Sequence, residues 1–200
     1  MSILEILQSQ LGGNNLSKMS QSLGADEKTT SNAISAALPT LLGALARNSA
    51  SPKGAESLHS ALNNDHDGSI LDNLGGLLGG SESGAGSAIL GHIFGGQQGR
   101  VERGLSQSSG IDAGGISKLM AMLAPMVMGA LGQQQKKGGL DAGGLAGLLG
   151  QERKNVEAQA PSQMGMLNSL LDADGDGDVD MADLASKGMG LLGGLLGGKR

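Results

Sequence analysis

The sequence predicts an all-α fold, a pseudo-symmetric duplicated helical bundle, and three observations support this prediction. The first is composition: the 200 residues include no Trp or Tyr and one Phe, and Leu, Ala, Ile and Met dominate the 38% that are hydrophobic. Because strands favour β-branched and aromatic residues, this mixture favours helices. The other two observations are an internal repeat and the helical spacing of the apolar residues within it.

The internal repeat relates two segments of the chain by one constant offset without gaps. Matches of Gly and Leu alone could reflect low complexity, but matches of Ser-Gln-Ser, Asp and Pro at one offset are harder to explain in that way. We therefore predict that residues 2–46 and 88–132 are two copies of one helical unit. The matching residues are Ser20-Gln21-Ser22 with Ser106-Gln107-Ser108, Gly24 with Gly110, Asp26 with Asp112, and Pro39 with Pro125.

Each copy is expected to contain three helical pieces, of which the first two are short. The first piece is apolar and covers residues 3–11 in copy one and 89–94 in copy two. The second piece is polar and ends near Gly24 or Gly110, because glycine suits the left-handed position that follows a helix.

The third piece of each copy is the most hydrophobic and is predicted to form the centre of the bundle. Asp26 and Asp112 precede these helices and are expected to cap their first turns. Pro39 and Pro125 lie in the middle of the two helices. Because proline has no N–H and clashes with the preceding turn, each helix is expected to kink there, or to break and restart.

The remaining segments are Gly-rich connectors and shorter helices. Between and after the copies we predict a short helix at 55–62, a turn at 63–69, a helix at 70–78, a flexible Gly/Ser-rich connector at 79–87, a Gly/Leu-rich stretch at 138–150, and a polar linker or exposed helix at 151–162. The predicted organisation is therefore a duplicated helical domain at 1–150, a linker at 151–162 and a C-terminal segment at 163–200.

Three of these segments together resemble a known bacterial family. They are the Ser-Gln-Ser helix, the run Leu-Pro-Thr-Leu-Leu-Gly-Ala-Leu-Ala at 38–46, and the segment His-Asp-Gly-Ser-Ile-Leu-Asp-Asn-Leu at 66–74. Over roughly residues 1–150 the chain resembles the bacterial domain of unknown function family 937, which is related to the all-helical YidB-like group. The resemblance implies an all-α bundle and no activity, because none is established for the family, and no catalytic residue carries over.

The C-terminal segment contains a motif that matches an EF-hand calcium loop position by position, at residues 172–183. Aspartates at positions 1, 3 and 5 would supply hard oxygen ligands, Gly177 at position 6 permits the sharp turn, and Val179 at position 8 is the apolar anchor. Position 7 would offer a backbone carbonyl and position 9 a bridging water. The candidate calcium ligands are Asp172, Asp174, Asp176, Asp178, Asp180 and Asp183.

One residue of this loop departs from the usual pattern. Asp183 stands at position 12, where glutamate normally closes the site with both oxygens. Aspartate is one methylene shorter, so the loop must tighten, and this affects affinity and selectivity over magnesium rather than the ligand set. Six of the 19 acidic residues lie in this loop, and carboxylates at that density repel one another without a cation. The alternative is a solvated Asp/Gly linker.

Residues 63–74 resemble a degenerate relative of the same loop. Asn63, Asp65 and Asp67 fall at positions 1, 3 and 5, but Leu74 replaces the closing carboxylate at position 12. An Asp-Gly turn before a helix is the simpler interpretation. The histidines His59 and His66 are seven residues apart with no further ligand cluster nearby, so a capping or surface role is expected for them rather than a transition-metal site.

Composition and motifs exclude several functions. Nucleic-acid binding is not expected, because the net charge is −5, the 14 basic residues are scattered and aromatic residues that could stack on bases are missing. Without Cys there is no disulfide or thiolate, and the sequence contains neither a G-x-S-x-G nor an H-E-x-x-H motif, so no enzyme is expected. The longest stretch without a strongly polar residue, 119–132, is short for a transmembrane segment.

The sequence thus leads to two main functional hypotheses, and a third, an enzyme that uses the His66-Asp67 region, is not expected to show activity. The first is a non-enzymatic bacterial protein that binds Ca²⁺ at its C-terminal loop. The second is a self-associating or envelope-associated scaffold, a homo-oligomer held by repeated Leu-Leu-Gly-Gly segments at 77–80 and in the tail 188–198. No basic region precedes an apolar run at the N-terminus, so a cytoplasmic location is expected, with envelope association as the alternative.

Overall fold

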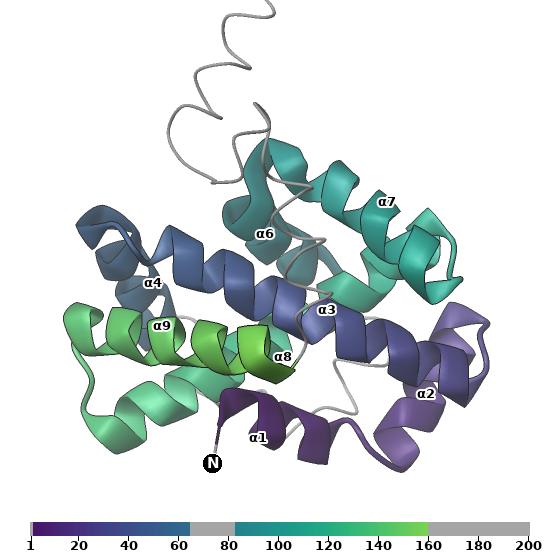
Figure 1. Ribbon diagram of the computed structural model, residues 1–200, viewed down its shortest axis with the longest axis horizontal. Coiled ribbons are helices and arrows are strands. Elements are labelled where there is room, and N and C mark those ends of the chain that lie inside the picture. Colours follow the sequence, from purple (N-terminus) through teal and green to yellow (C-terminus); the bar gives the residue numbers. More distant parts are fainter. Residues whose placement is uncertain (1, 65–82, 160–200) are drawn as a thin grey trace, which may run out of the picture.

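The computed structural model describes residues 2–64 and 83–159, and every regular element in these two stretches is helical (Figure 1). The predicted all-α class is therefore confirmed. In chain order the elements are α1 (Ile3–Gln10), α2 (Asn14–Leu23), α3 (Glu27–Asn48), α4 (Pro52–Asn64), α6 (Ser83–Phe94), the 3-10 turn η2 (Gly95–Gln97), α7 (Gln98–Ser109), α8 (Ala113–Gly138) and α9 (Ala142–Gln159).

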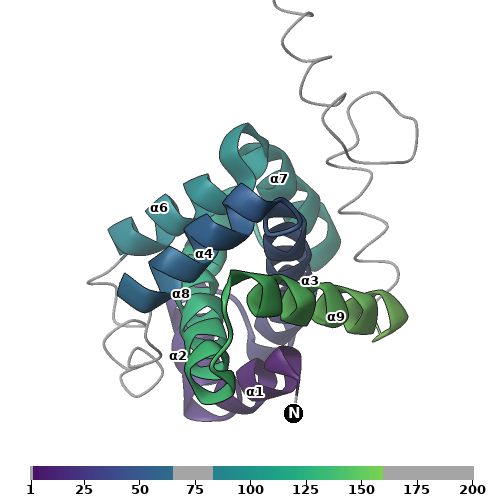
Figure 2. The ribbon, with the colours of Figure 1, turned by 90° about the vertical axis from the view of Figure 1, so that its left-hand side faces the viewer.

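Helices α3 and α8 form the centre of the bundle and contact each other (Figures 1 and 2). Residues 36–46 of α3 and 119–132 of α8 are buried without interruption. Helices that are apolar on all sides are typical of the enclosed core of a bundle. By length and composition α8 could also cross a membrane, but 78% of its most apolar window is buried inside the fold. Burial among the other helices accounts for its hydrophobicity.

The two central helices begin at the predicted aspartate caps. Asp26 Oδ1 accepts a hydrogen bond from the backbone N–H of Thr29 at 2.9 Å, and its Oδ2 accepts one from Thr29 Oγ1 at 2.7 Å. Asp112 Oδ1 accepts a hydrogen bond from the N–H of Gly115 at 2.8 Å. Each carboxylate satisfies an N–H that the first helical turn leaves without a partner.

The cap at Asp26 predicts a pH-dependent contribution to stability. Hydrogen bonds from Thr29 hold the pKa of Asp26 below its ordinary value of 3.8. The backbone N–H has the larger effect and the hydroxyl the smaller one. The unfolded chain keeps the ordinary pKa, so the stabilisation is complete above that value and is lost as the pH falls through the lowered pKa. Asp26→Ala should therefore unfold at a lower temperature than the wild type near pH 6, and the gap should shrink as the pH falls to about 2.

Thermal unfolding followed by far-UV circular dichroism measures this gap. Glu27→Ala is the matched control, because Glu27 is an exposed carboxylate next to the cap in sequence, whereas the capping hydrogen bonds from Thr29 go to Asp26. A gap for Asp26→Ala that stays constant between about pH 6 and pH 2 would contradict the cap as its cause.

The helices α2 and α7 end at the predicted glycines. Gly24 has φ 64° and Gly110 has φ 79°, and both are left-handed C-caps. Gly24 and Gly110 both end a helix, and Asp26 and Asp112 both cap the next one. The end of α2 and the start of α3 are therefore separated from the end of α7 and the start of α8 by the same number of residues.

Packing partners also follow the two halves of the chain. Helices α1, α2 and α4 of the first half each contact α8, and α6, α7 and α9 of the second half each contact α3. The halves are thus interleaved, since each one contributes helices that contact the central helix of the other, while α2 and α6 pack more extensively on the central helix of their own half.

The central helices continue through their prolines, so the predicted alternative of a break and restart is wrong. A proline deprives the carbonyl four residues earlier of its helical donor. For Pro39 that carbonyl belongs to the exposed Ser35, whereas for Pro125 it belongs to the buried Ala121. The backbone of α6 lies against the second of these carbonyls, because a Cβ added to Gly86 would overlap the Ala121 oxygen.

This contact explains a correction to the predicted connector 79–87. Its residues 83–87 are the first turns of α6, and Gly86 among them is buried. Glycine here allows two helix backbones to approach closely, whereas the sequence interpretation assigned it to flexibility. Residues 79–82 lie outside the described residues.

The segment after α8 is one helix rather than separate pieces. Helix α9 includes residues 142–150 of the Gly/Leu-rich stretch and continues through residues 151–159. Leu145, Leu149 and Val156 are fully buried, and α9 packs on α3 and α4. Helix α4 is likewise longer than the predicted 55–62 and begins at Pro52, a position at which the missing N–H costs nothing.

Candidate functional site

The predicted calcium loop, 172–183, lies outside the described residues, as do His66 and residues 65–74 of the degenerate loop. Asn63, which begins the degenerate loop, is described at the end of α4. Its Oδ1 accepts a hydrogen bond from Nε2 of the buried Gln135 of α8 at 3.0 Å, and its Nδ2 lies 3.3 Å from His59 Nδ1. The oxygen expected at position 1 of that loop is therefore engaged in joining α4 to α8.

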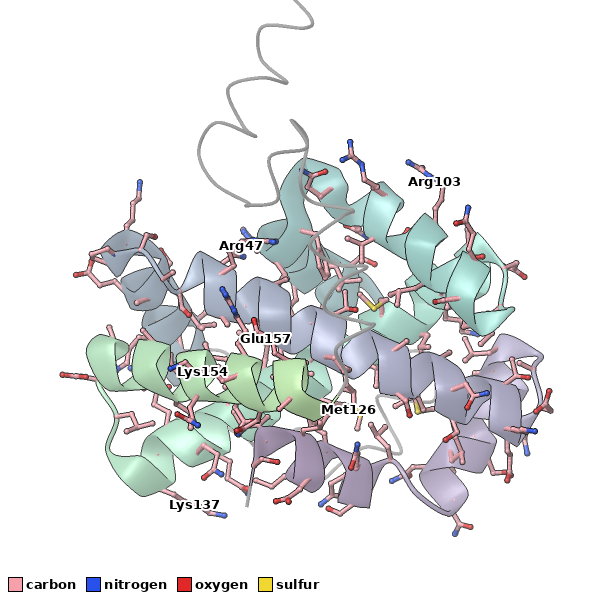
Figure 3. The ribbon with its side chains drawn as sticks, viewed as in Figure 1. Arg47, Arg103, Met126, Lys137, Lys154 and Glu157 are labelled. Atoms are coloured by element: carbon pink, nitrogen blue, oxygen red, sulfur yellow. The ribbon has the colours of Figure 1, made fainter. Side chains whose placement is uncertain are left out.

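Among the residues that the structure describes, no group of three His, Asp or Glu side chains could hold a metal ion. The basic side chains are also spread out: Figure 3 shows Arg103, Lys137 and Lys154 on three different helices, pointing outward at separate places. The feature with binding potential in this part of the chain is a groove.

The groove lies between α4 and α6, which rest beside each other on α8 (Figure 2). Its volume is about 720 Å³. That value is within the range of roughly 300–1,000 Å³ that is typical of small-molecule pockets. The apolar residues of its lining come from four helices and are Leu45, Leu58, Ala61, Ile89, Ile93 and Met128.

Hydrogen bonds between side chains and backbone groups stabilise the two walls of the groove. Asn48 Nδ2 donates a hydrogen bond to the carbonyl oxygen of Ile93 at 2.8 Å and so joins the end of α3 to the end of α6. On the other wall, Ser51 Oγ accepts a hydrogen bond from the N–H of Gly54 at 3.1 Å at the start of α4. A Cβ at Gly54 would overlap the Asn48 carbonyl, so only glycine allows α4 to approach the end of α3 this closely.

The polar residues of the lining are either uncharged or basic. None of the lining residues that the structure describes is a carboxylate. Lys53 and His92 are exposed on opposite walls, and neither has a hydrogen-bond or ion-pair partner in the described residues. Ser57 adds an exposed hydroxyl. The groove therefore combines an apolar floor with a rim that favours negative charge.

Sequence reasoning missed this groove because its residues are far apart along the chain. Leu45 belongs to the first copy and Ile93 to the second, and α4 lies outside both copies. Hydrophobic periodicity predicts which face of a single helix is buried. It does not indicate which faces of different helices will line the same groove.

A protein-family model described as "Bacterial protein of unknown function (DUF937)" matches residues 5–134. The matched stretch runs from α1 into α8. It includes residues 5–46 of the first copy and all of the second copy. Of the four helices that line the groove, it includes α3, α4 and α6 completely. No curated protein and no solved structure matches the chain.

Proposed function

The chain belongs to the DUF937 family of bacterial proteins of unknown function, and within that family we propose that it is a non-enzymatic binding protein that takes up Ca²⁺ at its C-terminal loop. The observation that carries this proposal is the register of residues 172–183. Aspartates fall at positions 1, 3, 5, 7, 9 and 12 of the loop, glycine at position 6 and an apolar residue at position 8. No position of the frame other than 12 departs from the EF-hand pattern.

Charge distribution supports the same proposal. The described helices contain slightly more Lys and Arg than Asp and Glu, so the net charge of −5 originates outside them, largely from the six aspartates of the loop. Carboxylates packed into one short loop repel one another, and a divalent cation removes that repulsion. Calcium binding would then order the loop, because the ligands converge only around the ion.

Calorimetric titration of the full chain with calcium chloride tests the proposal. Saturable binding is expected, and Asp172→Ala combined with Asp176→Ala should abolish it, because two of the first three ligands are lost. Asp183→Glu should strengthen binding, since the longer side chain can close the site with both oxygens.

The matched control is Asp65→Ala combined with Asp67→Ala, which removes the same charge from the degenerate loop and should leave the calcium heat unchanged. Absence of heat at millimolar calcium would contradict the proposal. That result would favour the self-associating scaffold, which sedimentation of the chain with and without residues 188–200 would then test.

A second part of the proposal concerns the symmetry of the helical domain. We infer that the two copies are related by a pseudo-twofold axis, with central helices bent at Pro39 and Pro125, and that the family relationship extends to the YidB-like group. The common offset of the caps and the interleaved packing of α1, α2 and α4 on α8 with α6, α7 and α9 on α3 support the pseudo-symmetry.

A further inference from the structure

We propose that the groove between α4 and α6 binds a single-chain amphiphile with an anionic head group, of which a fatty acid is the simplest member. The described lining residues belong to α3, α4, α6 and α8 or the turn between the first two, and the proposal uses no residue of the calcium loop. A volume of about 720 Å³ suits a small molecule.

The groove offers apolar surface that the described helices leave open, mainly on its two walls. Leu45, Ile93 and Met128 form its buried base, with exposed fractions of 3%, 6% and 4%. Leu58 and Ile89 stand on the two walls and are only partly buried. An alkyl chain lying on this floor would remove the remaining apolar surface from water, and the flexible Met128 side chain can adapt to its course.

The rim supplies the charge that selects an anionic head. Lys53 and His92 face the groove from opposite walls without partners in the described part of the chain, and Ser57 adds a hydroxyl donor. Glu56, the nearest acid along α4, is not part of the lining. A carboxylate or phosphate at the rim would therefore gain an attractive partner without displacing an existing ion pair.

Helix α9 provides a comparison, because its contact with α3 is more completely buried than the contact of α4 with α8. It packs on α3 with Leu145, Leu149 and Val156 fully buried. Helix α4, which packs on α8 in the corresponding manner, buries only Ala55 and Leu62. The groove therefore borders a helix that, over its described residues, has fewer fully buried apolar side chains than α9.

The test is a calorimetric titration of the full chain with dodecanoate below its micelle concentration, in the presence of a calcium chelator. Saturable binding to one site is expected. Dodecanol, which has the same chain and no charge, should bind more weakly. Dodecyl phosphate distinguishes the head groups: tighter binding than dodecanoate identifies a phosphate-bearing amphiphile, and weaker binding identifies a fatty acid. Because calcium is absent, failure here leaves the calcium proposal untouched.

Two variants and two matched controls assign the binding to the groove. Ala61→Phe fills the floor and should weaken dodecanoate binding by about tenfold or more. Lys53→Glu reverses the rim charge and should weaken it by at least about threefold. Ala113→Phe and Lys28→Glu make the same substitutions at exposed positions of α8 and α3 away from the groove, and both should bind dodecanoate as the wild type does.

Three results would overturn the proposal. The first is no saturable binding of any of the three probes, and the second is binding that Ala61→Phe leaves unchanged while far-UV circular dichroism shows a folded variant. The third is a dimer of the wild type, seen by sedimentation, that Ala61→Phe dissociates, because the groove would then be a contact between two copies of the chain.

Discussion

Gly86→Ala is expected to lower the free energy of unfolding by about 2–3 kcal/mol, the cost of forcing extra volume into a packed helix contact. The added Cβ would overlap the Ala121 carbonyl oxygen and lie 2.7 Å from its carbon, so α6 must move away from α8. Both of these neighbours are backbone atoms of a central helix and cannot turn aside as a flexible side chain would. The movement would also open the contact through which α6 covers the carbonyl freed by Pro125.

Urea unfolding followed by far-UV circular dichroism measures the effect, and Gly91→Ala in the same helix is the control. Gly91 is exposed and a Cβ there meets no atom within 4 Å. Alanine at that position should therefore stabilise the fold by about 0.5–1 kcal/mol, because glycine is a poor helix former. If the two alanine variants were equally stable, the close approach at Gly86 would be ruled out as a determinant of stability.

Phe94→Ala should destabilise the fold by about 3–4 kcal/mol, because it leaves a large cavity in the core. Phe94 is the one aromatic residue of the chain and is only 4% exposed at the end of α6. Phe94→Leu keeps most of the buried volume and should cost less than about 1.5 kcal/mol.

The repeat provides a further control for this prediction. The corresponding residue of copy one is Gln8, which is exposed. Gln8→Ala should change the free energy of unfolding by no more than about 0.5 kcal/mol. Urea unfolding of the three variants gives the comparison, and a loss below about 1 kcal/mol for Phe94→Ala would show that the ring is not an anchor of the core.

The most local parts of the fold followed from the sequence. Asp26 and Asp112 cap helices, and Gly24 and Gly110 end them, because each of these residues acts on backbone groups within one helical turn. The all-α class followed from composition for a similar reason, since helix propensity is a property of single residues.

Features that depend on contacts between distant segments did not follow from the sequence. Gly86 was assigned to a flexible connector because glycine has two uses, conformational freedom and close packing, and only the position of Ala121 decides between them. Asn63 was placed in a turn at 63–69, with a degenerate cation loop as the alternative, because its partner Gln135 lies on a different helix.

The sequence by itself determined the helical class, the repeat, the caps and a candidate set of calcium ligands, because propensities, capping bonds and loop registers act over a few residues. The tertiary structure decided which helices interleave, where glycine allows backbones to touch, and where α4 and α6 leave a groove with Lys53 and His92 at its rim. Those outcomes depend on how helices from both halves pack around α3 and α8. In a close-packed interior the position of each side chain depends on all of its neighbours, and these come from distant parts of the chain.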